Sequence, residues 1–159
     1  MLLAIQLEPT NVSYYINTAL IYLEQGKIIE ALSVLHKGHS VDASNAPINA
    51  LLGKTYCLSG DFTSAMLFFD TSLKTDPEDA YTHYDKAQCL LTYGRTEESR
   101  TSLFATLKNN PQLIDAYFYI ALSYEQEKNS EQASSFYNQF LSKAPPGNPL
   151  IAEAKAKVN

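Results

Sequence analysis

The stretch that decides the fold runs over residues 46–79 and reads APINALLGKTYCLSGDFTSAMLFFDTSLKTDPED. A glycine–aspartate pair interrupts it near the middle. Leu52 and Tyr56 lie one helical turn apart before this pair, and Ala65 and Phe69 do the same after it. Apolar residues at this spacing share one face of a helix with 3.6 residues per turn. The stretch therefore predicts two amphipathic helices joined by a short turn.

The landmarks of this stretch recur along the chain at intervals of 34 residues. Glycine, proline, tyrosine and alanine each keep a register of their own. The recurring sets are Gly26, Gly60 and Gly94; Pro9, Pro77, Pro111 and Pro145; Tyr22, Tyr56 and Tyr124; and Ala31, Ala65 and Ala133. A fixed period of this length indicates a repeat protein in which each unit packs against its neighbours.

The pattern also carries a family resemblance. In the central copy the landmarks are Leu52-Gly53-x2-Tyr56, Ala65-x3-Phe69 and Pro77. This resembles the tetratricopeptide repeat, whose landmarks over 34 residues are W-x2-L-G-x2-Y, A-x3-F and P. No copy has the tryptophan, and tyrosine replaces it in two copies. The resemblance implies an all-α fold, a right-handed superhelical solenoid of helix-turn-helix repeats.

The period divides residues 1–159 into consecutive parts of a single domain. Residues 1–11 are expected to be either the end of a preceding repeat, with Leu3, Ile5 and Leu7 in a helix, or a natural N-terminal cap. The first alternative would make the chain a piece of a longer protein. The remaining parts are four full repeats at 12–45, 46–79, 80–113 and 114–147, and a C-terminal capping helix at 148–159.

Each repeat is expected to contain two helices. The first helices are predicted at 12–25, 46–59, 80–93 and 114–127, and the second at 28–41, 62–75, 96–109 and 130–143. In the first three repeats a glycine stands between the two helices, where it can take the left-handed conformation that ends a helix. The fourth repeat has Lys128-Asn129 there, and we expect the asparagine to take this conformation because it tolerates positive φ better than most residues.

Charge and hydropathy argue against two classes of partner. The net charge is −5 and the lysine and arginine residues are scattered, so the chain lacks the basic stripe of a nucleic-acid-binding protein. The apolar run from Met1 to Ile5 is too short for a signal peptide or a membrane span. We therefore expect no nucleic acid, no direct membrane insertion and a cytoplasmic location.

The sequence offers little catalytic or metal-binding chemistry. His36 and His39 can share one helix face, but no further ligand completes the set of three or four that zinc needs. The chain contains no phosphate-binding loop and no nucleophile motif. We predict a protein that is not an enzyme and that uses no cofactor and no metal.

The surface is the remaining place for function. The resemblance implies that the first helices line a concave groove, which is the usual binding surface of such solenoids. Apolar side chains in the groove favour a protein or peptide partner with an apolar segment, although each of them could instead pack only against neighbouring helices. The groove residues predicted in this way are Ile16, Leu20, Leu23, Leu51, Lys54, Tyr81, Tyr84, Gln88, Leu91, Phe118, Tyr119 and Leu122.

One kind of partner is disfavoured by residue type. Tetratricopeptide co-chaperones hold the C-terminal carboxylate of heat-shock chaperones with a clamp of lysine, asparagine and arginine. The corresponding positions here are Ile16, Leu20, Leu51, Tyr81 and Asp85, none of which is a cation. The aspartate would repel a carboxylate, so we expect no binding of this type.

Three functions fit these observations. The first is a scaffold or adaptor that binds a peptide or a helix in its concave groove, as a module of a larger protein or assembly. The second is a structural spacer or a self-association module. The third is a regulatory arm of an enzyme whose catalytic domain lies elsewhere.

Overall fold

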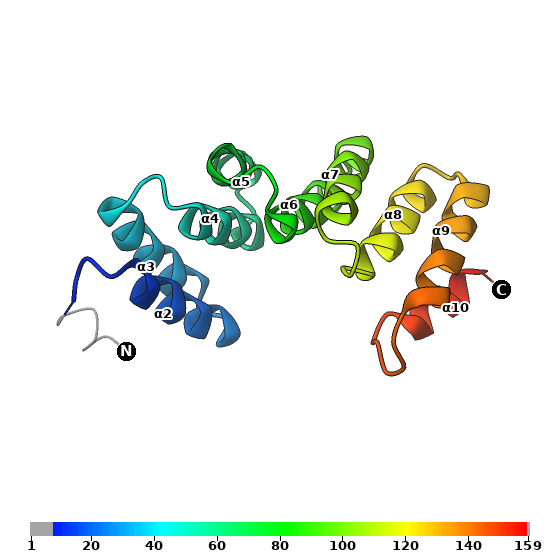
Figure 1. Cartoon of the computed structure of the whole chain (residues 1–159), viewed down its shortest axis with the longest axis horizontal. Coiled ribbons are helices and arrows are strands. Elements are labelled where there is room, and N and C mark those ends of the chain that lie inside the picture. The colour runs from blue at the N-terminus through cyan, green and yellow to red at the C-terminus, as the bar shows by residue number, and fades with distance from the viewer. Residues whose placement is uncertain (1–7, 159) are drawn as a thin grey trace. The chain divides into compact units, whose positions relative to one another are not determined.

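The computed structural model describes residues 8–158, and in this range the secondary structure is helical (Figure 1). The helices are α2 (Val12–Glu24), α3 (Ile28–Val41), α4 (Ala46–Ser59), α5 (Phe62–Thr75), α6 (Ala80–Thr92), α7 (Thr96–Asn109), α8 (Asp115–Gln126), α9 (Ser130–Lys143) and α10 (Ile151–Val158). The eight helices predicted for the four repeats lie within one residue of α2 to α9. The prediction of an all-α helical repeat solenoid is confirmed.

The chain divides into two compact units, Met1–Pro77 and Glu78–Asn159. The first contains α2 to α5 and the second α6 to α10. The single domain, the repeat boundaries and the right-handed sense of the solenoid remain predictions. The helix expected at Leu3, Ile5 and Leu7 lies outside the described residues.

Most of the helices begin at a residue whose side chain accepts a hydrogen bond from the first turn. Asn45 accepts from the backbone N–H of Ile48 at 3.1 Å, and Asp61 accepts from that of Ser64 at 3.0 Å. Such caps satisfy N–H groups that have no partner within the helix. They explain why α4 and α5 begin where the repeat pattern predicts.

The turn between the two helices of each repeat contains one residue with positive φ. Gly26, Gly60 and Gly94 have φ values of 70°, 90° and 72°. In the fourth repeat this residue is Lys128, with φ of 60°, so the expectation that Asn129 would be left-handed is wrong. Asn129 instead caps α9 and accepts a hydrogen bond from the backbone N–H of Gln132 at 3.2 Å. A residue that caps a helix needs a backbone that is not left-handed, so Asn129 cannot both cap α9 and have positive φ. Lys128 therefore has the positive φ that glycine has in the other three repeats.

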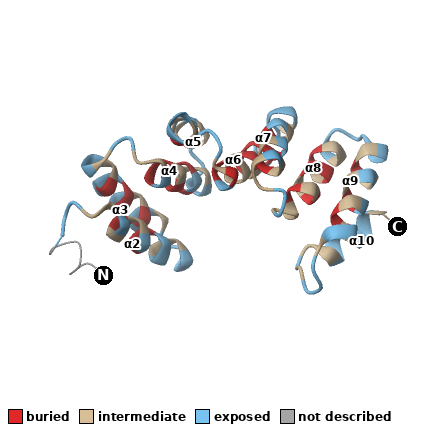
Figure 2. Ribbon diagram, in the orientation of Figure 1, coloured by how far each residue is buried: buried red, intermediate tan, exposed pale blue. Residues whose placement is uncertain are grey.

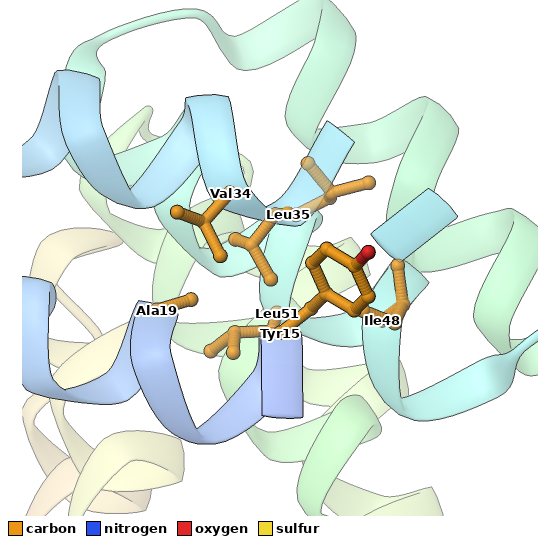
Figure 3. Close-up of a cluster of buried hydrophobic side chains, with 7 residues drawn as sticks. Tyr15, Ala19, Val34, Leu35, Ile48 and Leu51 are labelled. Carbon is orange, nitrogen blue, oxygen red and sulfur yellow. The ribbon is translucent and has the colours of Figure 1, made fainter. Parts of the chain in front are cut away.

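The core of the first unit lies among α2, α3 and α4 (Figure 3). Its hydroxyl-bearing member, Tyr15, donates a hydrogen bond to the carbonyl oxygen of Pro9 at 2.8 Å, so its polar end is satisfied while the ring is buried. The buried side chains are Tyr15, Ala19, Val34, Leu35, Ile48, Leu51 and Leu52.

Small residues let the two helices of each repeat approach closely. One buried register is Ala19, Gly53, Ala87 and Ala121, and the other is Ala31, Ala65, Ser99 and Ala133. Figure 2 shows that the buried residues follow the facing sides of the helices. Interiors are packed at crystal-like density, so a larger side chain at these positions would force its neighbours to move.

The helix α10 covers the apolar face of the fourth repeat. Ala154 is fully buried, and Ile151 and Val158 pack against a cluster that includes Tyr137 and Phe140. Asn148 prepares the start of this helix by accepting a hydrogen bond from the backbone N–H of Leu150 at 2.9 Å. These contacts agree with the capping role expected for the C-terminal segment.

Among residues 8–158, no helix is long and apolar enough to cross a membrane.

Candidate functional site

The second unit contains a hollow between the two first helices α6 and α8. Its volume is about 290 Å³, and it lies near the C-terminal ends of both helices. Its walls are Gln88, Leu91, Thr92, Tyr119, Leu122 and Gln126. Four of these, Gln88, Leu91, Tyr119 and Leu122, belong to the predicted groove residues. We call this space the α6/α8 hollow.

Two of the aromatic residues that were predicted to line the groove contact each other beside the α6/α8 hollow. The rings of Tyr84 on α6 and Tyr119 on α8 pack edge to face, with centroids 5.6 Å apart and an interplanar angle of 81°. Burial raises the pKa of the Tyr84 phenol well above its ordinary value, and Tyr119 and Asp115 raise it further. The Tyr84 phenol therefore stays neutral at physiological pH, and this part of the surface gains no charge from it.

A second hollow, of about 440 Å³, lies at the other end of α6 and α8. It contains the predicted residues Tyr81 and Tyr84, and Tyr81 is 61% exposed. The Asp115 carboxylate in its wall accepts a hydrogen bond from the Asn148 side-chain amide at 2.7 Å. The complete lining is Tyr81, Tyr84, Gln112, Leu113, Ile114, Asp115, Lys143, Pro145 and Asn148. We call this space the loop-side hollow.

Sequence reasoning missed the residues of the loop-side hollow that lie outside the first helices. Leu113 and Ile114 precede α8, whereas Pro145 and Asn148 lie between α9 and α10. The search for groove residues followed registers of the first helices only. The proline that recurs at the repeat ends, here Pro145, was a usable signal, because such loops carry binding residues disproportionately.

Phe118 does not lie in the groove, contrary to the prediction. It is 2% exposed and packs against Tyr137 and Phe140 of α9, at centroid distances of 5.4 and 5.6 Å. The next residue along the helix, Tyr119, lines the α6/α8 hollow instead. Successive residues on a helix point about 100° apart, so Phe118 can face α9 while Tyr119 faces the hollow.

The predicted groove residues of the first unit differ in their exposure. Leu20 is 43% exposed and Lys54 is exposed, whereas Ile16 and Leu23 are half-buried against the core. Leu51 is only 9% exposed and belongs to the core itself, so its prediction as a groove residue does not hold. In this unit, Leu20 and Lys54 are the most exposed of the predicted groove residues.

The two histidines that could have suggested a metal site have aromatic neighbours. His36 Nε2 lies 2.6 Å from the Tyr56 hydroxyl, and the rings of both histidines meet the edge or face of Phe68. Burial lowers the pKa of His36, and the neighbouring His39 lowers it further. Over the described part of the chain, no group of three or more histidine, cysteine, aspartate or glutamate side chains could hold a metal ion.

The geometry and the repeat pattern agree with comparisons against known proteins. Tetratricopeptide repeat models match residues 22–83, 58–122 and 115–146. The chain belongs to the tetratricopeptide repeat family. Members of this family are generally non-catalytic scaffolds that bind other proteins or peptides.

Solved structures share the fold at low sequence identity. PilF of Pseudomonas aeruginosa is 22% identical with a TM-score of 0.84, over 92% of this chain and 67% of that one. MamA of Desulfovibrio magneticus RS-1, from residue 41, is 22% identical with a TM-score of 0.74, over 84% and 76%. YrrB, described as a TPR protein with an unusual peptide-binding site, is 18% identical with a TM-score of 0.78, over 96% and 78%. No curated protein matches the sequence.

Proposed function

We propose that this chain is a scaffold or adaptor that binds a peptide or a helix of a partner protein along its first helices. The observation that supports this most is the α6/α8 hollow, because four of the residues predicted for the groove line it together. Leucine and tyrosine side chains give it an apolar lining, and apolar pockets with a few polar groups are typical of binding sites.

Two further features support the proposal. Tyr81 exposes most of its ring at the loop-side hollow, so an aromatic side chain is available at each of the two hollows. Tyrosine is enriched among the residues that dominate binding energies at interfaces. The likeness to YrrB agrees with peptide binding, although at this identity it extends only to the fold.

The proposal has three other parts. The chain acts as a module of a larger protein or assembly, it has no catalytic activity and needs no cofactor, and it works in the cytoplasm. The partner contributes an apolar segment, and binding of a chaperone C-terminus by a carboxylate clamp is not expected. Fractionation of cells that express the tagged natural protein tests the location.

The binding surface is tested with a pair of charge insertions. Leu122→Arg places a cation in the α6/α8 hollow, whereas Ser135→Arg places one at an exposed position of α9. Partners captured by the wild-type chain and identified by mass spectrometry are then titrated against both variants. The proposal predicts that only Leu122→Arg weakens binding, by at least about tenfold, as for loss of a central contact.

Equal binding to both variants would show that the partner does not contact the α6/α8 hollow, and it would refute the proposed binding surface. Binding only between copies of this chain would support the self-association module instead. Melting curves of both variants establish that each one is folded before the affinities are compared.

A further inference from the structure

The C-terminal helix α10 is held on the fourth repeat at its centre and at both of its ends. At the centre, Ala154 is fully buried in a cluster of α8 and α9 side chains. Just before the helix, the Asn148 side-chain amide donates a hydrogen bond to the Asp115 carboxylate at 2.7 Å. Near its end, Lys157 forms an ion pair with Glu125. We call the surface formed by Asp115, Phe118, Glu125, Tyr137 and Phe140 the α10 seat.

The helix α10 is too short to be stable away from such a surface. It has eight residues, and isolated helices shorter than about 12 residues are marginal in water. Ile151, Ala154 and Val158 would also lose the burial that they gain on the seat. We therefore expect α10 to occupy either the seat of its own chain or the identical seat of another copy.

The connection between α9 and α10 contains a tight turn. The backbone N–H of Asn148 donates a hydrogen bond to the carbonyl oxygen of Pro145 at 3.1 Å, which closes a turn of four residues. Pro146 is its second residue and Gly147, with φ of 90°, its third. Proline followed by a residue with positive φ is typical of a type II turn, which needs glycine at the third position. The path of α10 back to its own seat thus depends on Gly147.

The rest of the connection favours an extended path. Residues 144–150 include Pro145, Pro146 and Pro149, and prolines stiffen a linker in an extended conformation. Ala144 already has φ of −64° and ψ of 131°, as expected for a residue before proline. If the turn opens at Gly147, the connection becomes an extended segment of at most about 25 Å, with α10 at its end.

We propose that α10 is exchanged between two copies of this chain, so that the seat of each copy binds the α10 of the other. The seat contacts are the same in the closed chain and in the dimer. The balance therefore depends on the protein concentration and on the turn at Gly147. Reciprocal exchange fills both seats and gives a closed dimer with two-fold symmetry. This inference goes beyond the proposed peptide binding and does not depend on it.

The exchange would make the loop-side hollow a joint site of two copies. Pro145 and Asn148 both line this hollow, and they lie on opposite sides of Gly147 in the sequence. In the closed chain the Asn148 that contacts Asp115 belongs to the same copy. In the exchanged dimer it would come from the second copy, while Pro145 would stay with the first.

The test compares two glycine substitutions that have the same local cost. Among the described residues, a Cβ added at Gly147 would meet no other atom within 4 Å, so Gly147→Ala strains only the turn. Gly60→Ala is the matched control, because Gly60 has the same φ of 90° and the same free space but connects α4 to α5. Size-exclusion chromatography with light scattering gives the mass of the wild type and of both variants over a range of concentrations.

The inference predicts that Gly147→Ala lowers the dimer dissociation constant by at least about tenfold, because exchange relieves two strained turns in each dimer. Gly60→Ala should associate no more than the wild type. Adding Ala154→Gln to Gly147→Ala should abolish the dimer, since it disrupts the buried centre of the helix. Adding the exposed change Ala152→Gln instead should leave the dimer intact.

A cross-linking experiment shows directly whether the helix is exchanged. Isotope-labelled and unlabelled Gly147→Ala chains are refolded together, and a carbodiimide joins the Lys157 amine to the Glu125 carboxylate. Mass spectrometry should then find Lys157 of labelled chains joined to Glu125 of unlabelled ones. The same experiment on the monomer fraction should give only cross-links within one chain.

Three results would overturn the inference. The first is a Gly147→Ala variant that is folded by circular dichroism and monomeric at every concentration. The second is a dimer that survives Ala154→Gln or whose cross-links stay within one chain, because such a dimer uses another surface. The third is equal dimerisation of Gly60→Ala, which would attribute the effect to general destabilisation. None of these results affects the test of peptide binding with Leu122→Arg.

Discussion

Gly53 of α4 lies directly against the ring of Phe69 of α5. A methyl group added at Gly53 would come 2.7 Å from the ring carbon Cδ1 of Phe69, which is closer than real contacts of this kind. The corresponding pairs in the first and third repeats are Ala19 with Leu35 and Ala87 with Leu103. In the fourth repeat the corresponding pair is Ala121 with Tyr137, so an aromatic ring at this position does not by itself require glycine. The close approach of the Phe69 ring to Gly53 is what leaves no room for a methyl group in the second repeat.

This relationship predicts the effect of Gly53→Ala. The clash should lower the free energy of unfolding by about 1–3 kcal/mol, the usual cost of overpacking, even though alanine favours a helix more than glycine does. The measurement is chemical denaturation followed by circular dichroism. The double variant Gly53→Ala/Phe69→Leu recreates the pairing of the first repeat and should be more stable than the sum of the two single changes predicts. Strict additivity would contradict the packing described here.

The turn of the fourth repeat offers a stabilising substitution. Lys128 has φ of 60°, where a residue with a side chain is strained by roughly 1–2 kcal/mol. Lys128→Gly should raise the free energy of unfolding by about 0.5–1 kcal/mol after the greater entropy of glycine in the unfolded chain is subtracted. Lys128→Ala is the matched control, because it removes the charge but keeps the strain. Equal stabilisation by both changes would attribute the effect to charge rather than to conformation.

The helix α10 contains a matched pair of alanines. Ala154 is fully buried against the fourth repeat, whereas Ala152 on the same helix is exposed. Ala154→Gln should lower the free energy of unfolding by about 1–3 kcal/mol, since it forces a larger polar group into a packed site. Ala152→Gln should have little effect.

Deletion of residues 148–159 should lower the melting temperature and promote aggregation, and an unchanged melting curve would show that the segment is not a cap.

The His36 cluster predicts a pH dependence of stability. Burial and the neighbouring His39 lower the pKa of His36 from its ordinary value of 6.5 in the folded chain. Below pH 6.5 the unfolded chain therefore binds a proton that the folded chain does not, and the free energy of unfolding falls as the pH drops. Among the described residues, the carboxyl groups with shifted pKa values are lowered from 3.8 or 4.5, so they remain charged at pH 5.

The measurement is the free energy of unfolding at pH 7 and pH 5 for the wild type and for His36→Gln. The wild type should lose more stability than the variant between these values, because glutamine does not titrate. An identical loss would show that the pKa of His36 does not differ between the folded and unfolded chains.

The sequence predicted the repeat fold because the helix periods and turns are local. Apolar spacing, Gly60 in its turn and the caps at Asn45 and Asp61 all point to the same helix ends. Lys128 was missed because the capping of α9 by Asn129 outweighs the intrinsic preference of asparagine for positive φ. That competition depends on the neighbouring helix and is not a property of one residue.

The candidate site was predictable only in part. Adding 34 residues placed Gln88, Leu91, Tyr119 and Leu122 on the first helices, and the structure brings them to one hollow. The 34-residue period also led to the prediction of Phe118 as a groove residue. The period identifies the helix that lines the groove, but it does not tell which of the adjacent residues Phe118 and Tyr119 faces α9. The loop-side hollow is lined in part by residues of the loop before α8 and of the loop between α9 and α10. The conformation of these loops does not follow from the helix period.

The central claim is that a peptide binds at the α6/α8 hollow. Nuclear magnetic resonance of the chain with ¹³C-labelled leucine methyl groups, titrated with a peptide selected on the whole chain from a random library displayed on phage, tests it most directly. The account predicts that the methyl signals of Leu91 and Leu122 shift most, while those of Leu103, buried in the core of the same unit, change little. Saturating binding that leaves the signals of Leu91 and Leu122 unchanged would contradict the account.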